Sequence, residues 1–336
     1  MASRIARRTI MIVLTLGLAL SASAQAPDPL APLFAADQKE ARAALLIVDG
    51  RVAAKHYAPG YSDANRFISW SMAKSITALL VGELVADGRL QLDAPAPVAE
   101  WRNDGRRQIT LRHLLHMSSG LRHIEVGKPV ENSDTNQLLF VSGTGGMAAQ
   151  AIARPLAAAP GTKFNYDSMT SLILSEVITR ALTPSRDPRV RAEAYRTFAE
   201  ERLFRPAGVT SAVLEFDGAG TQVGGSIMHM SLDDWGRMGR LLLDGKGADG
   251  RSQVIAPEWL AFMKMKAPKA TRYAGHVWLS PNGLVSMRGH LGQFVFTGER
   301  NGRAVILVRL GKTQDNVSKP VIAALERLGD AALEQR

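Results

Sequence analysis

The sequence of 336 residues contains no cysteine, so disulfide bonds and a cysteine-linked lipid anchor are both excluded. It also shows no internal repeat and no low-complexity stretch. A chain of this length can bury enough apolar surface to be stable without covalent cross-links. We therefore expect one large domain, or two interleaved ones, held together by burial alone.

A long apolar run is missing as well. Residues 10–20 are apolar, but this is about half the length that a bilayer-spanning helix needs. The run follows a basic segment and leads to the small-residue pattern Ala22-Ser23-Ala24. These features predict a cleavable signal peptide over residues 1–24, so the exported chain would start near Gln25. We expect a periplasmic or secreted protein without a stable membrane anchor, exported by the general secretory or the twin-arginine route.

Acidic residues are the scarcer charge, with 31 Asp and Glu against 41 Lys and Arg, which gives a formal net charge of +10. Such an excess raises the question of a nucleic-acid partner. The basic residues are scattered singly, however, without a basic run or interleaved aromatic residues. The charge is interpreted as solvated surface, and no nucleic-acid partner is expected.

Two other kinds of site receive little support. No G-x-S-x-G motif occurs, which argues against an α/β-hydrolase nucleophile. His113 and His116 form an HxxH pair, with His123 close by, but no further ligand has a diagnostic spacing. A structural role for His113 is favoured, and neither a metal nor an organic cofactor is expected. Gly311-Lys312-Thr313 resembles a Lys-Thr-Gly motif but follows a strand pattern instead of opening one.

Strand patterns occur near both ends of the chain. Residues 44–57 form two strand-like segments around Asp49-Gly50, which is typical of a hairpin. Residues 276–310 contain more such segments, with turns at Asn282-Gly283 and Asn301-Gly302. Helical spacing of apolar residues is found in the other long segments, 71–86, 109–117, 168–181, 231–243 and 320–333.

This order predicts an α+β fold, with one antiparallel sheet built from both termini and flanked by helices. A mostly helical subdomain would be inserted between the two strand regions. Within the mature domain, residues 25–336, we expect the sheet part to cover about 30–68 and 222–336 and the helical part about 69–221. A cleft would lie between the two parts.

The strongest chemical signal is Ser71 with Lys74, the single S-x-x-K of the chain. Residues three apart on a helix share a face, so a lysine amine at this position can take the proton of the serine. An ordinary lysine has a pKa of about 10.4, so Lys74 must be desolvated or placed near other cations to be neutral. A helix start beneath Ser71 would also direct free N–H groups at developing negative charge.

Two further segments could reach such a site. Pro160-Gly161 begins a turn and an extended stretch that delivers Tyr166 just before a predicted helix. Gly289-His290-Leu291-Gly292-Gln293 has glycines that would let a substrate approach the backbone at the start of a sheet strand. Each segment alone is equally compatible with an ordinary turn.

The order and spacing of these motifs resemble the serine β-lactamase and penicillin-binding-protein family, in particular class C enzymes, related esterases and 6-aminohexanoate-dimer hydrolases. The resemblance covers most of the mature chain and implies a β-lactamase/transpeptidase-like fold. It rests on these segments in chain order: Ser71-Met72-Ala73-Lys74, Ile109 to Leu115 leading to Ser118-Ser119-Gly120-Leu121, Pro160-Gly161 before Tyr166, Gly224-Gly225-Ser226 before Asp234-Trp235, and Gly289 to Gln293.

The resemblance also implies roles for single residues. Ser71 would be acylated, and Lys74 and Tyr166 would share the general-base and general-acid role. Ser168 stands where class C enzymes have asparagine, and His290 stands where the third motif usually has lysine.

The same resemblance implies an oxyanion hole made by the backbone N–H groups of Ser71 and Gln293, with Gly292 beside it on the substrate-binding segment. Histidine in place of lysine replaces a permanent cation by a group that is mostly neutral near physiological pH. A site for the carboxylate of penicillins or D-Ala-D-Ala peptides normally needs that cation, although Arg288 could supply it.

The sequence therefore favours an amidase or esterase that acts on a small-molecule substrate. A β-lactamase or D-Ala-D-Ala carboxypeptidase, and a non-catalytic penicillin-binding sensor, stay open as alternatives.

Overall fold

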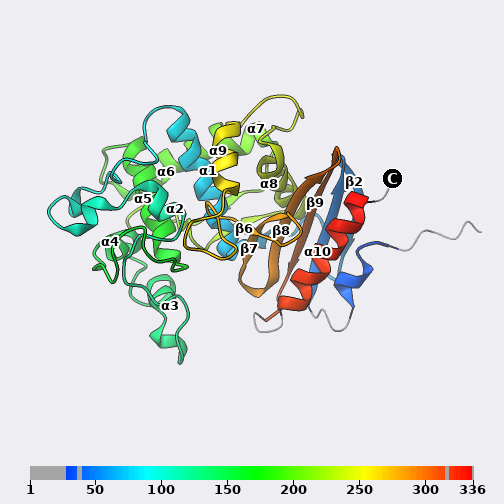
Figure 1. Cartoon of the computed structure of the whole chain (residues 1–336), viewed down its shortest axis with the longest axis horizontal. Coiled ribbons are helices and arrows are strands. Elements are labelled where there is room, and N and C mark those ends of the chain that lie inside the picture. Colours follow the sequence, from blue (N-terminus) through cyan, green and yellow to red (C-terminus); the bar gives the residue numbers. More distant parts are fainter. Residues whose placement is uncertain (1–27, 36–39, 315–317, 335–336) are drawn as a thin grey trace, which may run out of the picture.

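The structure is a computed structural model that describes residues 28–35, 40–314 and 318–334. The predicted signal peptide lies outside the described residues. The chain forms a sheet-containing part and a mainly helical part, which lie side by side (Figure 1). Segments from both ends of the sequence meet in the sheet, and the middle of the chain forms the helical part.

The large sheet has six antiparallel strands in the order β2-β1-β9-β8-β7-β6. Its strands are β1 (Ala41–Val48), β2 (Arg51–Tyr57), β6 (Trp278–Leu279), β7 (Val285–Gly289), β8 (Gln293–Arg300) and β9 (Arg303–Gly311). The N-terminal hairpin pairs with the last strand, β9, so the two ends of the chain share one sheet. This arrangement confirms the predicted α+β, β-lactamase/transpeptidase-like fold.

The predicted hairpin turns are present, and their backbone explains the residues found there. Asp49 and Gly50, between β1 and β2, both have left-handed φ, at +49° and +77°. Asn301 and Gly302, between β8 and β9, repeat this pattern at +53° and +76°. Two successive left-handed residues match the twist of paired strands, which is why these pairs are read correctly from sequence.

Helices cover both faces of the large sheet. The C-terminal helix α10 (Ser318–Glu334) packs on one face against Phe296 and Leu307. Helix α8 (Leu232–Asp244) packs on the other face, where a Cβ on Gly239 would lie 2.6 Å from Ile306. Ser231 accepts a hydrogen bond from the backbone N–H of Asp234, so it caps α8 as the sequence predicts.

The helical part is arranged around α1 (Ala73–Ala86), whose residues are buried from Ala73 to Leu84. A small sheet, β3-β5-β4, lies beside it, formed by β3 (Phe67–Ile68), β4 (Val213–Leu214) and β5 (Met228–Met230). The other helices are α2 (Leu111–Leu115), α3 (Asp134–Phe140), α4 (Met147–Ile152), α5 (Ser168–Leu182), α6 (Pro188–Ala199), α7 (Arg205–Ala207) and α9 (Pro257–Lys264).

One predicted helix is shorter than the sequence suggests. The apolar spacing predicts a helix over 109–117, but α2 spans only Leu111–Leu115. Thr110 caps its start, and Met117 has a left-handed φ of +54°, which a continuing helix cannot contain. Met117, which follows α2, is buried although it lies in a turn and not in a helix.

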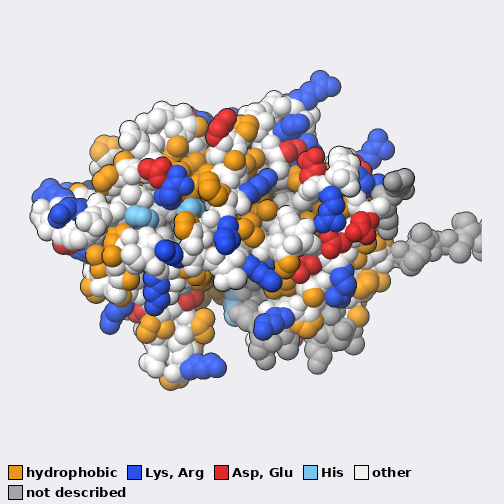
Figure 2. Space-filling model, viewed as in Figure 1, with side chains coloured by type: hydrophobic (Ala, Val, Ile, Leu, Met, Phe, Trp, Pro, Cys, Tyr) orange, Lys and Arg blue, Asp and Glu red, His pale blue; other side chains and the backbone are white. Residues whose placement is uncertain are grey.

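The surface agrees with a dispersed charge. Lysine and arginine side chains are spread over the face shown in Figure 2 without gathering into one stripe. Among the helices of the described residues, none combines the length and the apolar composition needed to cross a membrane.

The packing of α1 against α9 generates a stability prediction. A Cβ added to Gly82 would lie 2.3 Å from Nε1 of Trp259, a nitrogen that donates to the carbonyl oxygen of Ala78. Gly82→Ala should therefore lower the free energy of unfolding by about 1–3 kcal/mol, because it overpacks a closed interface. Gly145→Ala is the control, since nothing lies within 4 Å of its added Cβ. Urea denaturation of both variants tests this, and equal stabilities would contradict it.

Candidate active site

A cavity of about 540 Å³ is lined by Ser71 and by several of the other residues that the sequence singles out. Its walls come from both parts of the fold, namely the turn before α1, residues 125–140, the start of α5, the end of β7 and the start of α10. Ser71, Tyr166, Ser168 and His290 all line it. The structure therefore brings together four residues that are far apart in the sequence.

Ser71 lies in a tight turn, Trp70–Met72, that leads directly into α1. Trp70 has a left-handed φ of +42°, a strained conformation for a bulky residue. Its ring is held edge-on against the ring of His290 at a centroid distance of 5.2 Å. On the other side of the turn, a Cβ on Gly289 would lie 2.2 Å from the carbonyl oxygen of Ser69. Glycine at this position lets the end of β7 pack directly against the turn that carries Ser71.

Lys74 lies one turn further along, and only 1 % of its surface is exposed. Its Nζ donates hydrogen bonds to Ser71 Oγ at 2.9 Å, Ser168 Oγ at 2.8 Å and the carbonyl oxygen of Gly225 at 2.6 Å. The three donors of the ammonium group are thus matched by three acceptors. The contact between Lys74 and Ser71 that the spacing predicts is present.

The Gly224-Gly225-Ser226 segment gains a physical role from this contact. A Cβ on Gly225 would lie 2.6 Å from the carbonyl oxygen of Ser168, and one on Gly224 would lie 2.2 Å from Ser175 Oγ. Only glycine at these two positions lets the segment approach α5 closely. This approach carries the carbonyl oxygen of Gly225 to Lys74.

Burial lowers the pKa of Lys74 to about 8, and the negative charges of Glu125 and Asp167 oppose that shift. His276 is also close to Lys74, but burial lowers its pKa to about 3, so its ring is neutral. Lys74 can therefore exchange its proton near neutral pH, which an exposed lysine cannot do.

Glu125 is the main residue of the site that the sequence does not reveal. Its Oε1 accepts a hydrogen bond from Ser168 Oγ at 2.6 Å, and its Oε2 accepts from the Ser168 N–H and from Thr135 Oγ1, both at 2.8 Å. The hydroxyl of Ser168 thus donates to Glu125 and accepts from Lys74. No motif or spacing marks Glu125, because it lies in a loop and reaches Ser168 only through the fold.

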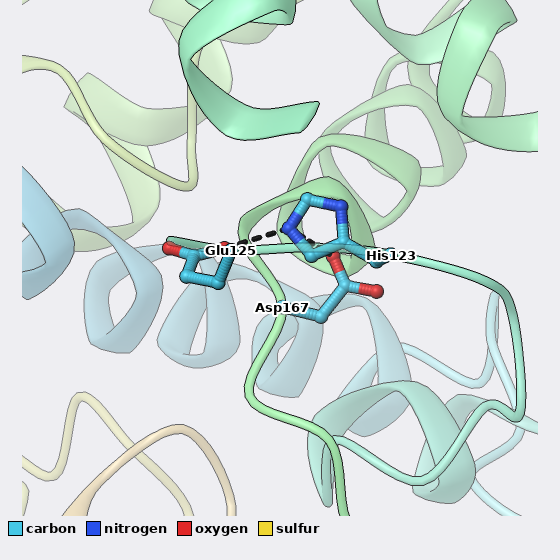
Figure 3. A group of neighbouring side chains, drawn as sticks. All are labelled: His123, Glu125 and Asp167. Carbon is cyan, nitrogen blue, oxygen red and sulfur yellow. Dashed lines mark hydrogen bonds and ion pairs between the residues drawn. The ribbon is translucent and has the colours of Figure 1, made fainter. Parts of the chain in front are cut away.

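Glu125 also belongs to a cluster with His123 and Asp167 (Figure 3). Burial alone would raise the pKa of Glu125, but the hydrogen bond from His123 and the charge of Lys74 outweigh it and hold that pKa at about 2. Burial would lower the pKa of His123, and its two carboxylate neighbours raise it above the ordinary value. The cluster therefore places an ionised Glu125 beside Lys74 and beside His123, whereas burial raises the pKa of Asp167 above its ordinary value.

The same three side chains have donor atoms of the kinds that bind metals, all within 4.8 Å of one another. His123 Nε2 is, however, bonded directly to Glu125 Oε2 at 2.8 Å. Asp167 accepts hydrogen bonds from the N–H groups of Met169 and Thr170 at the start of α5. We interpret the cluster as a hydrogen-bonded support for Ser168.

Tyr166 precedes α5, and its ring lines the cavity. The ring packs against Tyr273 and Trp278 at centroid distances of 5.7 and 5.5 Å. Lys74 Nζ lies 5.0 Å from the centroid of the same ring. Tyr166 and Ser168 thus both lie close to Lys74.

The segment Gly289 to Gln293 differs from its predicted form. Gly289 ends β7, residues 290–292 form a tight turn, and Gln293 begins β8, so the motif does not open a single strand. The reason is local, because Leu291 and Gly292 have successive left-handed φ values of +58° and +78°. Gly289 and His290 line the cavity, whereas Gly292 and Gln293 do not. Gln293 is buried, and its amide donates to the carbonyl oxygen of Gly311 at 2.6 Å.

The histidines considered for a metal site make different contacts in the structure. Thr110 and His113 form a capping box at the start of α2, and the ring of His113 packs beneath Gly161. His116 stacks on Phe262 at a centroid distance of 5.1 Å. His113 therefore has the structural role that the sequence favours.

A serine on a cavity wall, hydrogen-bonded to a buried lysine at the start of a helix and lying beside an antiparallel sheet, is typical of the class of penicillin-recognising folds. The comparison with family models agrees, because the Beta-lactamase model matches residues 31–330. The chain belongs to the β-lactamase family.

Solved structures add detail on the fold. A protein from Bacillus anthracis described as a 6-aminohexanoate-dimer hydrolase is 19 % identical and superposes with a TM-score of 0.72, covering 89 % of this chain and 82 % of that one. A family VIII carboxylesterase is 16 % identical, with a TM-score of 0.68 and coverages of 91 % and 96 %. A protein from Bacteroides dorei described as a β-lactamase is 17 % identical, with a TM-score of 0.67 and coverages of 90 % and 97 %.

The family to which the chain belongs thus includes hydrolases and esterases. A search of curated proteins found no match.

The contacts of Glu125 generate a prediction for the titration of Lys74. Glu125→Gln removes a negative charge that raises the pKa of Lys74, so this pKa should fall below its value of about 8. Carbon-13 NMR of labelled lysine side chains can follow the titration, with the signal assigned by a Lys74→Met variant. Glu131→Gln, an exposed change in the same loop, is the matched control and should leave the titration unchanged. An unchanged Lys74 titration in Glu125→Gln would contradict the proposed coupling.

Proposed function

We propose that the protein is an exported serine hydrolase that cleaves an amide or ester bond through an acyl-enzyme on Ser71. The observation that carries this proposal is the hydrogen bond of 2.9 Å between the fully buried Lys74 and Ser71 on the wall of the cavity. Membership of a family that includes hydrolases and esterases supports the same class of reaction.

The proposed reaction begins with Lys74 in its neutral form. Its Nζ accepts the proton of Ser71 Oγ while the oxygen forms a bond to the carbonyl carbon of the substrate. The tetrahedral intermediate then collapses, the bond to the leaving group breaks, and the leaving group receives the proton through Lys74 and Tyr166. A water molecule attacks the acyl-enzyme by the same sequence of proton transfers, which releases the acid and restores Ser71.

Stabilisation of the oxyanion needs N–H donors beside Ser71. The first is the backbone N–H of Ser71, as the resemblance implies. We place the second at the end of β7, because Gly289 and His290 line the cavity next to the Ser71 turn. The resemblance implies the backbone N–H of Gln293 as the second donor. Gln293, however, begins β8 on the other side of the turn from Gly289 and does not line the cavity, and its side chain hydrogen-bonds to β9.

The polar groups on the cavity wall bear on the type of substrate. His290 takes the position of the usual lysine, which favours uncharged amides or esters. Arg288 also lines the cavity; its guanidinium forms an ion pair with Glu326 at 3.9 Å and donates hydrogen bonds to Ser286 and Ser280. This weakly neutralised guanidinium supports a second candidate function, the hydrolysis of carboxylate-bearing substrates such as β-lactams or D-Ala-D-Ala peptides.

The nucleophile is tested by Ser71→Ala. This variant should lose turnover of p-nitrophenyl esters while still unfolding cooperatively on heating, because it removes one small hydroxyl and only one of the three acceptors of Lys74. A fluorophosphonate should label the wild-type protein at Ser71 and leave the variant unlabelled, as peptide mass spectrometry can show. Full activity of the variant, or labelling at another serine, would overturn the assignment. A stable acyl adduct of the wild type with nitrocefin, formed without turnover, would instead indicate a penicillin-binding sensor.

The role of His290 is tested by His290→Lys. A lysine ammonium should raise kcat/KM for the anionic substrate nitrocefin relative to p-nitrophenyl acetate by about five- to a hundredfold, since only the carboxylate gains a charge-assisted hydrogen bond. The ratio of the two kcat/KM values is measured in both proteins. If the ratio does not change, this position does not select the substrate, and Arg288→Gln then tests whether the arginine does.

A further inference from the structure

Exposed apolar side chains are concentrated in one segment of the described chain. Nine large hydrophobic residues are exposed, and five of them lie between residues 124 and 141: Ile124, Val126, Val130, Phe140 and Val141. Val126 is the most exposed, at 79 %. The segment includes α3, which projects from the helical part, and apolar side chains are visible on this projection (Figure 2). Single exposed apolar residues are ordinary, but a group of them indicates a binding surface.

This surface continues into the cavity that contains Ser71. Val126, Val130, Leu139 and Phe140 all line that cavity. Trp70, the neighbour of Ser71, extends this surface toward Ser71, because the centroid of its ring lies 6.5 Å from that of Phe140. We call these five side chains the apolar wall. It extends from the exposed side chains of Val126, Val130 and Phe140 to Trp70 beside Ser71.

The charged group next to the apolar wall, the Glu125 carboxylate, is already engaged within the protein. Glu125 lies beside Val126, but its two carboxylate oxygens already accept hydrogen bonds from His123, Thr135 and Ser168. A charged substituent would therefore lose its hydration beside Glu125 without gaining a partner from that carboxylate, and the polar groups left on this side, such as the Asn136 amide, are uncharged. An apolar chain would instead exchange water for contacts with valine, leucine and aromatic side chains.

We propose that the apolar wall is a subsite for an unbranched apolar chain of the substrate, so that the enzyme acts on esters or amides of medium-length chains in preference to acetyl compounds. This inference rests on the proposed function, because it places the chain relative to an acylated Ser71. Because the apolar wall reaches Trp70, the residue beside Ser71, the group that binds to it is inferred to be part of the substrate.

The size of the effect follows from burial. Complete burial of one methylene raises affinity about fourfold. A chain in an open cavity is expected to gain about half of the corresponding free energy, which is about twofold in affinity per methylene. From acetate to octanoate, kcat/KM should therefore rise by several tens of times, provided that the substrate stays below its micellar concentration.

The experiment is a chain-length series of p-nitrophenyl acetate, butyrate, hexanoate and octanoate. It compares the wild type with the double variant Val126→Ser/Phe140→Ser. We expect the ratio of kcat/KM for octanoate to that for acetate to fall by about tenfold in the double variant. Val52→Ser is the matched control, because Val52 is 60 % exposed on β2, away from the cavity, and it should leave the ratio unchanged. Melting temperatures check that all proteins are folded.

The proposal is overturned if the wild-type ratio is flat along the series, or if the double variant keeps the wild-type ratio. It is also overturned if the wild type sediments as a dimer and the double variant as a monomer, because the apolar surface would then be an interface between copies. Labelling rates of Ser71 with short- and long-chain alkyl fluorophosphonates give a second readout that does not need turnover. Labelling that is independent of chain length rejects the subsite alone, whereas no labelling at Ser71 rejects the proposed function itself.

Discussion

The burial of one lysine is the constraint on which the site depends. Lys74 is almost completely removed from water, so its ammonium group must find all of its hydrogen-bond partners inside the protein. They come from three separate segments, the turn before α1, the start of α5 and the loop at Gly225. Fixing these acceptors around Nζ fixes the position of Ser71 as well. The same burial lowers the pKa of Lys74 to about 8, so a structural constraint also prepares a proton acceptor.

A second layer of charge keeps this arrangement stable. A buried cation without a counterion is strongly unfavourable, and Glu125 supplies that counterion through the hydroxyl of Ser168. His123 and Asp167 hold Glu125 and the start of α5 in turn. The hydroxyl of Ser168 therefore joins the lysine to a carboxylate. A hydroxyl can donate and accept at one atom, which suits this bridging position.

The cavity joins two surfaces of different character beside Ser71. On the sheet side, the end of β7 brings Gly289 and His290 against the Ser71 turn, with Arg288 on the same wall. On the helical side, residues 126–140 present an apolar surface that is open to solvent. Trp70 stands between the two and contacts the rings of both His290 and Phe140. Its strained backbone is held by this packing, so the residue next to Ser71 links the two sides of the cavity.

The sequence by itself determined what depends on neighbours along the chain. The hairpin turns, the cap of α8 and the pairing of Ser71 with Lys74 follow from local backbone preferences and helical periodicity, and the resemblance carried by the ordered motifs gave the fold. Only the tertiary structure decided the roles of Glu125 and Gln293. Glu125 meets Ser168 across a separation of 43 residues, and no periodicity records such a contact. Gln293 turns away from the cavity because two left-handed residues reverse the chain before it, and the burial of its amide depends on β9.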